Sequence, residues 1–192
     1  MGRVACETLV TTGLALITGE ITTNANYVDI PSLVRNVIRD IGYTEASYGF
    51  DCEHCALLTA IDGQSPDIAM GVDRRGAGDQ GMMFGYACTE TNELMPAPIH
   101  FSHAILRSLA NARHSGSEPG LGPDSKSQVT LLYSNGKPVK AASIVVSTQH
   151  AEDLSQDEVR EIVRPHVLNV LPDGWMCEEE EFYVNPTGRF VI

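Results

Sequence analysis

A β-hairpin followed by an amphipathic helix occurs twice in this sequence, and this repeated order restricts the fold more than any other feature. The stronger hairpin has the turn Ser134-Asn135-Gly136 between Val129–Tyr133 and Val139–Thr148. The first lies in Val4–Thr23, where two runs rich in Val, Leu, Ile and Thr flank Thr12-Gly13. Both patterns predict paired antiparallel strands, each pair packed against the helix that follows it.

The helices are predicted from apolar spacing and from capping residues. Apolar positions from Leu33 to Ile41 repeat at helical spacing, after Asp29 and Pro31 and before Gly42. Another helix opens at Ser155, where a capping box with Glu158 is predicted and Pro165 is expected to kink the helix. A third helical pattern runs from Phe101 to Ala112 and is expected to end near Gly116, and 55–61 is typical of a buried strand.

These elements mix without the regular alternation of a doubly wound sheet, so the predicted class is α+β. We expect two similar layered units, each with a mixed or antiparallel sheet and helices packed on one face. The stretch from Asp62 to Gly81 is dense in Gly, Asp, Pro and Gln and is expected to be a loop at the domain boundary. The predicted division is 1–70, a linker at 71–81 and a second domain at 82–192.

Charge and composition exclude several classes of protein. The 25 acidic and 13 basic residues give a formal charge of -12, which leaves no basic face for nucleic acid. No apolar run approaches the roughly 20 residues of a membrane span, and no signal-peptide pattern is present, so we expect no membrane partner and a cytoplasmic location. The five cysteines are scattered and odd in number, which favours reduced thiols. Cys52 and Cys55 have metal-like spacing without a second pair, so we set a zinc site aside.

Two short motifs combine charges suited to a nucleotide. Asp124-Ser125-Lys126 places a carboxylate and an ammonium on one face of a strand, which suits a ribose hydroxyl and a phosphate. Arg189-Phe190 joins a guanidinium to a ring that can stack on a base. Taken alone, the first is also typical of a surface ion pair and the second of a turn leading into a strand.

Three further carboxylates stand in unusual surroundings. Glu7 and Glu20 lie in apolar, hydroxyl-rich strands, where an unpaired charge is costly, so each is expected to meet a cation or ammonium group. A cross-strand salt bridge is the alternative for both. Asp79 lies within the glycine-rich run Gly76–Gly81, which lets a backbone approach a ligand but is also typical of a plain turn.

Taken in order, the motifs of the whole chain closely resemble the bacterial S-adenosylmethionine synthetases. The segments that carry the resemblance are Val4–Thr8, Gly19–Ile21, Gln64–Ile68, Gly76–Tyr86, Leu94–Pro98, Pro123–Gln128, Ser147–His150 and Asn185–Ile192. The resemblance implies formation of S-adenosylmethionine from ATP and L-methionine, with release of phosphate and pyrophosphate, and use of Mg²⁺ and K⁺. It also implies a homodimer or a dimer of dimers.

The resemblance also assigns roles to residues. It implies that Asp124, Ser125, Lys126, Arg189 and Phe190 bind ATP, and that Lys126 and Asp79 are the catalytic residues. It implies further that Glu20 and Gln64 bind methionine and that Glu7 is a potassium ligand.

The sequence departs from the family pattern in three places. The glycine-histidine-proline-aspartate motif expected before residue 1 and the lysine- and arginine-rich segment expected after Ile192 are missing, and the mobile gate near Arg75 is shortened. The 71–81 stretch is therefore expected to be a shortened gate loop, and the chain to be a fragment without turnover of its own. The alternative is a non-catalytic dimerisation or ligand-binding module derived from the enzyme.

Overall fold

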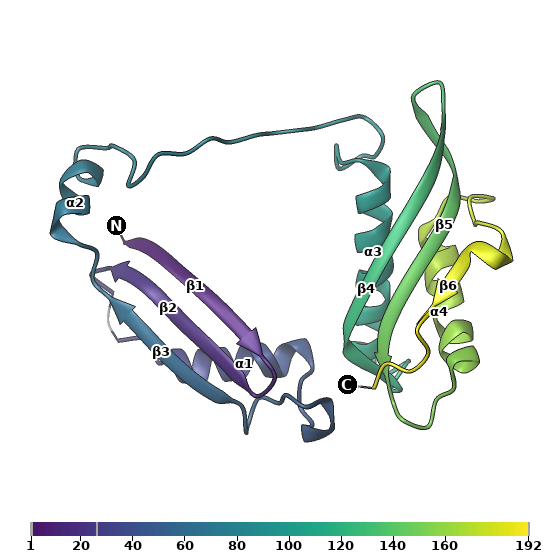
Figure 1. Ribbon diagram of the computed structural model, residues 1–192, viewed down its shortest axis with the longest axis horizontal. Helices are drawn as coiled ribbons and strands as arrows, with labels where there is room; N and C mark the ends of the chain where they lie inside the picture. Colours follow the sequence, from purple (N-terminus) through teal and green to yellow (C-terminus); the bar gives the residue numbers. More distant parts are fainter. Residues whose placement is uncertain (1, 26, 192) are drawn as a thin grey trace. The chain divides into compact units, whose positions relative to one another are not determined.

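The computed structural model describes residues 2–25 and 27–191. The chain forms two compact units, Met1–Phe84 and Gly85–Ile192 (Figure 1). No helix within the described residues is long and apolar enough to cross a membrane.

The first unit is a three-stranded sheet with one long helix on a single face. Strands β1 (Arg3–Thr11) and β2 (Leu14–Thr22) pair antiparallel, and β3 (Ala56–Asp62) lies parallel to β2. Helix α1 (Ile30–Ile41) covers one face of this sheet, and the short 3₁₀ turn η1 (Ala46–Tyr48) follows it. The predicted hairpin and helix are both confirmed.

Local chemistry fixes these boundaries. Gly13, at φ 76°, makes the hairpin turn. The Asp29 carboxylate accepts the Ser32 backbone N–H at 3.1 Å and caps α1, which ends at Gly42 in the left-handed conformation. The predicted loop over 62–81 is wrong in part, because α2 (Pro66–Val72) forms inside it. Pro66 in the first turn of α2 is the start signal, and an acidic residue follows it.

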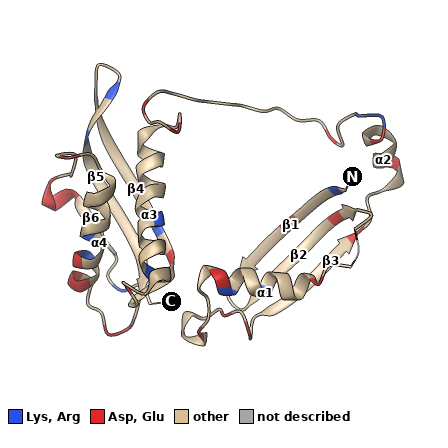
Figure 2. Ribbon diagram, turned by 180° about the vertical axis from the view of Figure 1, so that it is seen from behind, with Lys and Arg blue, Asp and Glu red and all other residues tan. Residues whose placement is uncertain are grey.

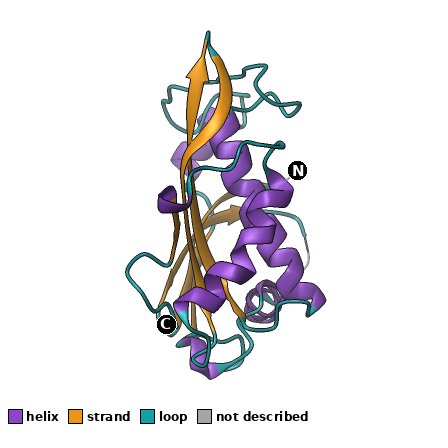
Figure 3. Ribbon diagram, turned by 90° about the vertical axis from the view of Figure 1, so that its right-hand side faces the viewer, coloured by secondary structure: helices purple, strands orange, loops and turns teal. Residues whose placement is uncertain are grey.

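The second unit repeats this topology with a longer hairpin and a shorter third strand. Strands β4 (Leu121–Ser134) and β5 (Lys137–His150) form the antiparallel hairpin, and β6 (Phe182–Val184) lies parallel to β5. Helices α3 (Ala97–Ser115) and α4 (Gln156–Val170) pack against each other and cover one face, as Figure 3 shows. The 3₁₀ turn η2 (Glu179–Glu181) leads into β6.

Both units therefore contain a hairpin, a helix and a third strand parallel to the second, in that order. The α+β class and the two similar layered units are confirmed. Antiparallel pairing needs only a tight turn, whereas the parallel third strand needs a crossover, and α1 and α4 supply it. The capping box is also confirmed: the Glu158 N–H donates to Ser155 Oγ and the Ser155 N–H donates to Glu158 Oε2 at 2.8 Å.

Two boundaries differ from the sequence expectation. Helix α3 begins at Ala97, four residues before Phe101, because Glu90 Oε2 accepts the Ala97 N–H at 2.8 Å and caps the helix from outside. Strand β4 begins at Leu121, eight residues before the expected start at Val129, and its register against β5 shifts between Leu121 and Ser125. Pro165 lies within α4, which is helical as far as Val170.

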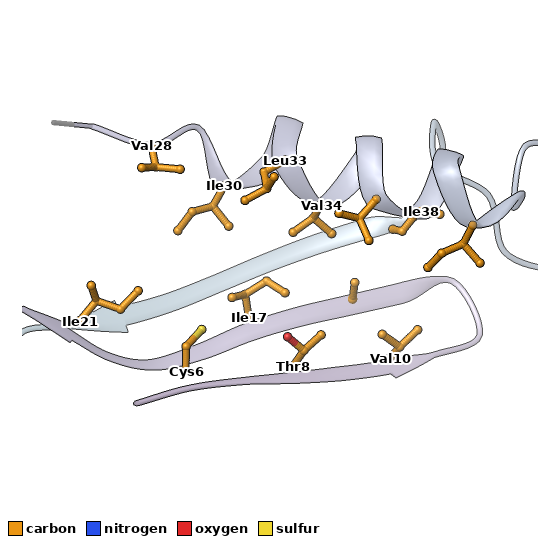
Figure 4. A pocket seen from close by; sticks show the side chains of 13 residues that line it. Cys6, Thr8, Val10, Ile17, Ile21, Val28, Ile30, Leu33, Val34 and Ile38 are labelled. Atoms are coloured by element: carbon orange, nitrogen blue, oxygen red, sulfur yellow. The ribbon is translucent and has the colours of Figure 1, made fainter. Parts of the chain in front are cut away.

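The two units differ in how completely they bury a core. The second unit encloses a large apolar cluster between its helices and its sheet, with Ile105, Ile144, Val146, Val159, Val163, Val167 and Phe182 almost fully buried. Among its described residues, the first unit has a much smaller cluster, around Ile38, Cys52 and Cys55. An apolar groove of about 520 Å³ remains beside that cluster, where α1 side chains such as Val34 and Ile38 face Thr8 and Val10 of β1 across an open space (Figure 4).

Candidate functional site

A small polar cavity lies in the second unit, where β4, β5 and the segment after β6 come together. It has a volume of about 220 Å³ and is lined by Lys126, Ser147, Asn185, Thr187, Arg189 and Phe190. Residues 126 and 189–190, more than sixty positions apart in the sequence, are thereby brought to one surface. The fold thus joins the two nucleotide motifs of the sequence.

The position of Lys126 follows from strand register. Lys126 pairs with Ser147 across the hairpin, and both side chains line the cavity. The Lys126 ammonium lies 5.8 Å from the centroid of the Phe190 ring, within cation–π range. Lys126 is exposed, so its charge can reach a ligand. A positive charge and a ring face therefore stand side by side, as a nucleoside phosphate requires.

A second cation, Arg189, borders the same cavity. Its Nη2 lies 2.7 Å from Oε1 of Glu152, and the two side chains are 59% and 80% exposed. An ion pair as exposed as this one is weak. Local cations matter in this chain because acidic side chains outnumber basic ones across both units (Figure 2).

Asp124 and Ser125 precede Lys126 on β4 but do not line this cavity within the described part of the chain. The Asp124 N–H donates to Gln149 Oε1 at 3.4 Å, and Ser125 pairs with Thr148 across the hairpin. No ion pair joins Asp124 to Lys126 among residues 2–25 and 27–191, so the surface ion-pair interpretation is not supported.

A second cavity, of about 260 Å³, lies in the first unit beside the ends of the strands. Arg3, Val4, Ala5, Glu20, Gln64, Val72 and Gly78 line it. The Arg3 guanidinium donates to Gln64 Oε1 at 2.8 Å and also pairs with the Asp73 carboxylate, so Gln64 is held in place. Glu20 and Gln64, which are 44 residues apart in the sequence, thus share one pocket.

Glu7 and Glu20 have no cation directly opposite them on a neighbouring strand. Glu7 pairs with Thr18, and Glu20 lies between Ala5 of β1 and Asp62 of β3, so the register gives neither carboxylate a directly opposed salt-bridge partner. Glu7 lies on the face of the sheet opposite α1, because its neighbours Cys6 and Thr8 line the groove below that helix.

Metal ligands are incomplete in the part of the chain that is described. It contains no group of three or more His, Cys, Asp or Glu side chains that could hold a metal ion. Asp79 is exposed, and its carboxylate accepts the N–H of the adjacent Gln80 at 2.7 Å. These donors do not make a Mg²⁺ or K⁺ site by themselves.

The sequence did not single out four buried polar residues next to the cavity that Lys126 lines. Thr148, Gln149 and His150 are consecutive polar residues that are nearly fully buried at the end of β5, and Asn185 is buried beside them. One feature of the sequence could have predicted them: consecutive polar residues continue the apolar strand β5, and polar side chains that are buried in this way need hydrogen-bond partners.

Comparison with known families identifies the chain. Residues 1–66 match the family model of the S-adenosylmethionine synthetase N-terminal domain, and residues 74–190 match that of the central domain. The chain belongs to the S-adenosylmethionine synthetase family. The resemblance noted in the sequence is therefore confirmed.

Relatives in three bacteria agree with this assignment. The chain is 60% identical over 197 residues to S-adenosylmethionine synthase 2 of Rhodospirillum rubrum, 58% over 199 to the S-adenosylmethionine synthase of Paramagnetospirillum magneticum, and 57% over 196 to that of Rhodospirillum centenum. Each alignment covers 99% of this chain and 50% of the relative. The chain spans about half the length of the curated relatives it matches.

Proposed function

We propose that this chain forms part of an enzyme that makes S-adenosylmethionine from ATP and L-methionine and releases phosphate and pyrophosphate. The observation that carries the proposal is the cavity where Lys126, Arg189 and the Phe190 ring meet, in a member of the S-adenosylmethionine synthetase family. The alignment with three named synthases supports the same reaction.

The reaction makes one bond and breaks one bond at the same carbon. A lone pair of the methionine sulfur forms a bond to C5′ of ATP, while the C5′–oxygen bond breaks and its electrons leave with the triphosphate. The product is a sulfonium cation, and water then cleaves the triphosphate to phosphate and pyrophosphate. Catalysis therefore requires in-line placement of sulfur, carbon and oxygen, and positive charge at the leaving group.

In the proposed nucleotide site, Lys126 and Arg189 bind the phosphates and Phe190 offers its ring to the adenine. Lys126 acts as a catalytic residue because it stabilises the negative charge that grows on the departing triphosphate. Asp124 and Ser125 stand directly before Lys126 on β4 and contribute the ribose side of the site. The closeness of the Lys126 ammonium and the Phe190 ring, 5.8 Å to the centroid, supports this arrangement.

In the proposed methionine site, Glu20 accepts the ammonium group of the amino acid and Gln64 hydrogen-bonds to it. Their shared cavity and the Arg3–Gln64 hydrogen bond of 2.8 Å support this pairing. Asp79, the second proposed catalytic residue, follows Gly78, which lines the same cavity.

Magnesium and potassium belong to the proposal as ions that neutralise the triphosphate and the pocket. Glu7 is the proposed potassium ligand. We also propose assembly as a homodimer or a dimer of dimers in the cytoplasm. The sheet face opposite α1 supports this assembly, because it carries Leu9 and Leu58, each 54% exposed.

The same exposed sheet face favours a second candidate, a dimerisation or ligand-binding module without catalysis. The two candidates differ in one measurable respect. The module predicts self-association or ligand binding alone, whereas the enzyme predicts that this half of the molecule can replace the corresponding half of an active synthase.

A chimera tests the proposal. The aligned half of the Rhodospirillum rubrum relative is replaced by this chain, and S-adenosylmethionine formed from ATP and methionine is measured by mass spectrometry. The enzyme proposal predicts product, and predicts its loss in the Lys126→Ala chimera. A folded chimera that makes no product, beside an active parent, would favour the module.

A further inference from the structure

The polar end of strand β5 holds two separated segments against each other. Gln149 is 3% exposed and His150 is 2% exposed, and both side chains bond to backbone groups of residues distant in the sequence. Burying such polar groups is costly unless each finds a partner. Their partners lie beside the residues of the proposed nucleotide site.

Gln149 bonds to both segments with one amide group. Its Oε1 accepts the Asp124 N–H at 3.4 Å, and its Nε2 donates to the Val191 carbonyl at 3.0 Å. The Gln149 amide thereby spans from the start of β4 to the end of the Arg189–Val191 segment. A Cβ on Gly122 would lie 2.6 Å from Gln149 Oε1, so this position admits the amide only because it is glycine.

His150 forms hydrogen bonds to the Phe190 backbone through both its own backbone and its ring. The His150 N–H donates to the Phe190 carbonyl at 2.9 Å, and the Phe190 N–H donates to His150 Nε2 at 3.1 Å. Because Nε2 accepts, the ring hydrogen is on Nδ1, which donates to the Ala151 carbonyl at 2.9 Å. Residues 189–191 are not part of a strand. The side chains of Gln149 and His150 therefore supply hydrogen bonds that a neighbouring strand would otherwise make to this backbone.

We infer that Gln149 and His150 are positioning residues that fix the Phe190 and Asp124 backbones, and so set the distance between the adenine side and the ribose side of the nucleotide site. Neither side chain lines the cavity among the described residues, so both act through others. The inference rests on the proposed function for its ligand, and on hydrogen bonds for its geometry.

Two substitutions of His150 separate positioning from packing. His150→Gln retains an acceptor near the place of Nε2, whereas His150→Asn is too short to reach the Phe190 N–H. Ser102→Ala is the control, because it removes a buried hydrogen bond to the Ser127 carbonyl, 2.8 Å long, in the same unit. Gln149→Met keeps the side-chain length and removes both bonds of the amide.

The experiment combines amide hydrogen exchange, read at Phe190, with ATP titration of each variant. We expect H150N to speed exchange at Phe190 and to weaken ATP affinity, each about tenfold, which corresponds to one buried hydrogen bond. H150Q is expected to keep exchange at Phe190 and ATP affinity close to the wild-type values, and S102A is expected to change neither. Q149M is expected to weaken ATP affinity as H150N does, and it keeps the inference testable if H150N fails to fold.

Unchanged exchange at Phe190 in folded H150N would overturn the inference. So would an equal loss of ATP affinity in S102A, because that result would indicate general destabilisation. If the wild-type chain and the chimera bind no ATP while H150N still speeds exchange at Phe190, the proposed function fails. In that case His150 fixes the Phe190 backbone but serves no nucleotide site.

Discussion

Replacing Glu152 by glutamine tests whether Arg189 serves a phosphate. In the structure the Arg189 guanidinium is paired with Glu152 at 2.7 Å, and the side chains are 59% and 80% exposed. An exposed pair of this kind contributes about 0.2–1 kcal/mol. A phosphate that binds Arg189 must displace Glu152, so Glu152→Gln should strengthen ATP binding by roughly 1.4- to 5-fold.

The measurement is calorimetric titration with ATP at low and at high salt, with Glu178→Gln as the matched control. Glu178 forms a similar exposed pair with Lys140 at 2.6 Å and lies outside the nucleotide cavity, so both variants change the net charge by the same amount. E152Q should bind ATP more tightly than E178Q, and the difference should shrink as salt screens the charges. Equal affinities, or weaker binding by E152Q, would refute the reasoning about Arg189.

Three further predictions concern single residues. Lys126→Ala should weaken ATP binding about tenfold and leave methionine binding unchanged, because the substitution removes one of the two cations of the nucleotide cavity and none from the other cavity; calorimetry with each ligand checks this, and an equal loss for methionine would contradict it. The guanidinium groups of Arg164 and Arg160 hold the pKa of Glu179 at about 2, below its usual 4.5, so this pairing stabilises the fold above about pH 4.5 and the benefit disappears as the pH falls towards 2. Urea unfolding from pH 6 to pH 2 should therefore show a smaller acid loss in E179Q than in wild type, and parallel curves would argue against it. Ile144→Ala should lower the free energy of unfolding by about 2–5 kcal/mol, because Ile144 is fully buried in the core of the second unit; a loss below 1 kcal/mol in denaturant unfolding would count against that core.

Local signals predicted most of the fold. The Asn135-Gly136 turn, the Asp29 and Ser155 caps and the apolar spacing of α1 each depend on neighbours within a few residues, and the structure contains all of these elements. The start of α3 was missed because its cap, Glu90, lies seven residues before the amide that it accepts. Helix α2 was missed because it is short and lies among residues typical of loops.

The candidate site was predictable by residue type, but its supports were not. Lys126 and Phe190 were chosen for charge and ring, but they come together only because β4 pairs with β5 and the segment after β6 bonds to His150 at the end of β5. The residue types of Gln149 and His150 do not indicate their role, because that role depends on burial and on backbone carbonyls that follow β6. Long-range hydrogen bonds of this kind require the tertiary structure.

The most direct test of two separate ligand sites is a ligand titration of the isotope-labelled chain followed by NMR. ATP should shift the amide signals of Lys126, Ser147 and Phe190, and methionine should shift those of Glu20 and Gln64, each with little effect on the other group. That result would support a nucleotide cavity in the second unit and an amino-acid cavity in the first. ATP shifts that appear at Glu20 and Gln64 and spare Lys126 and Phe190 would contradict the account.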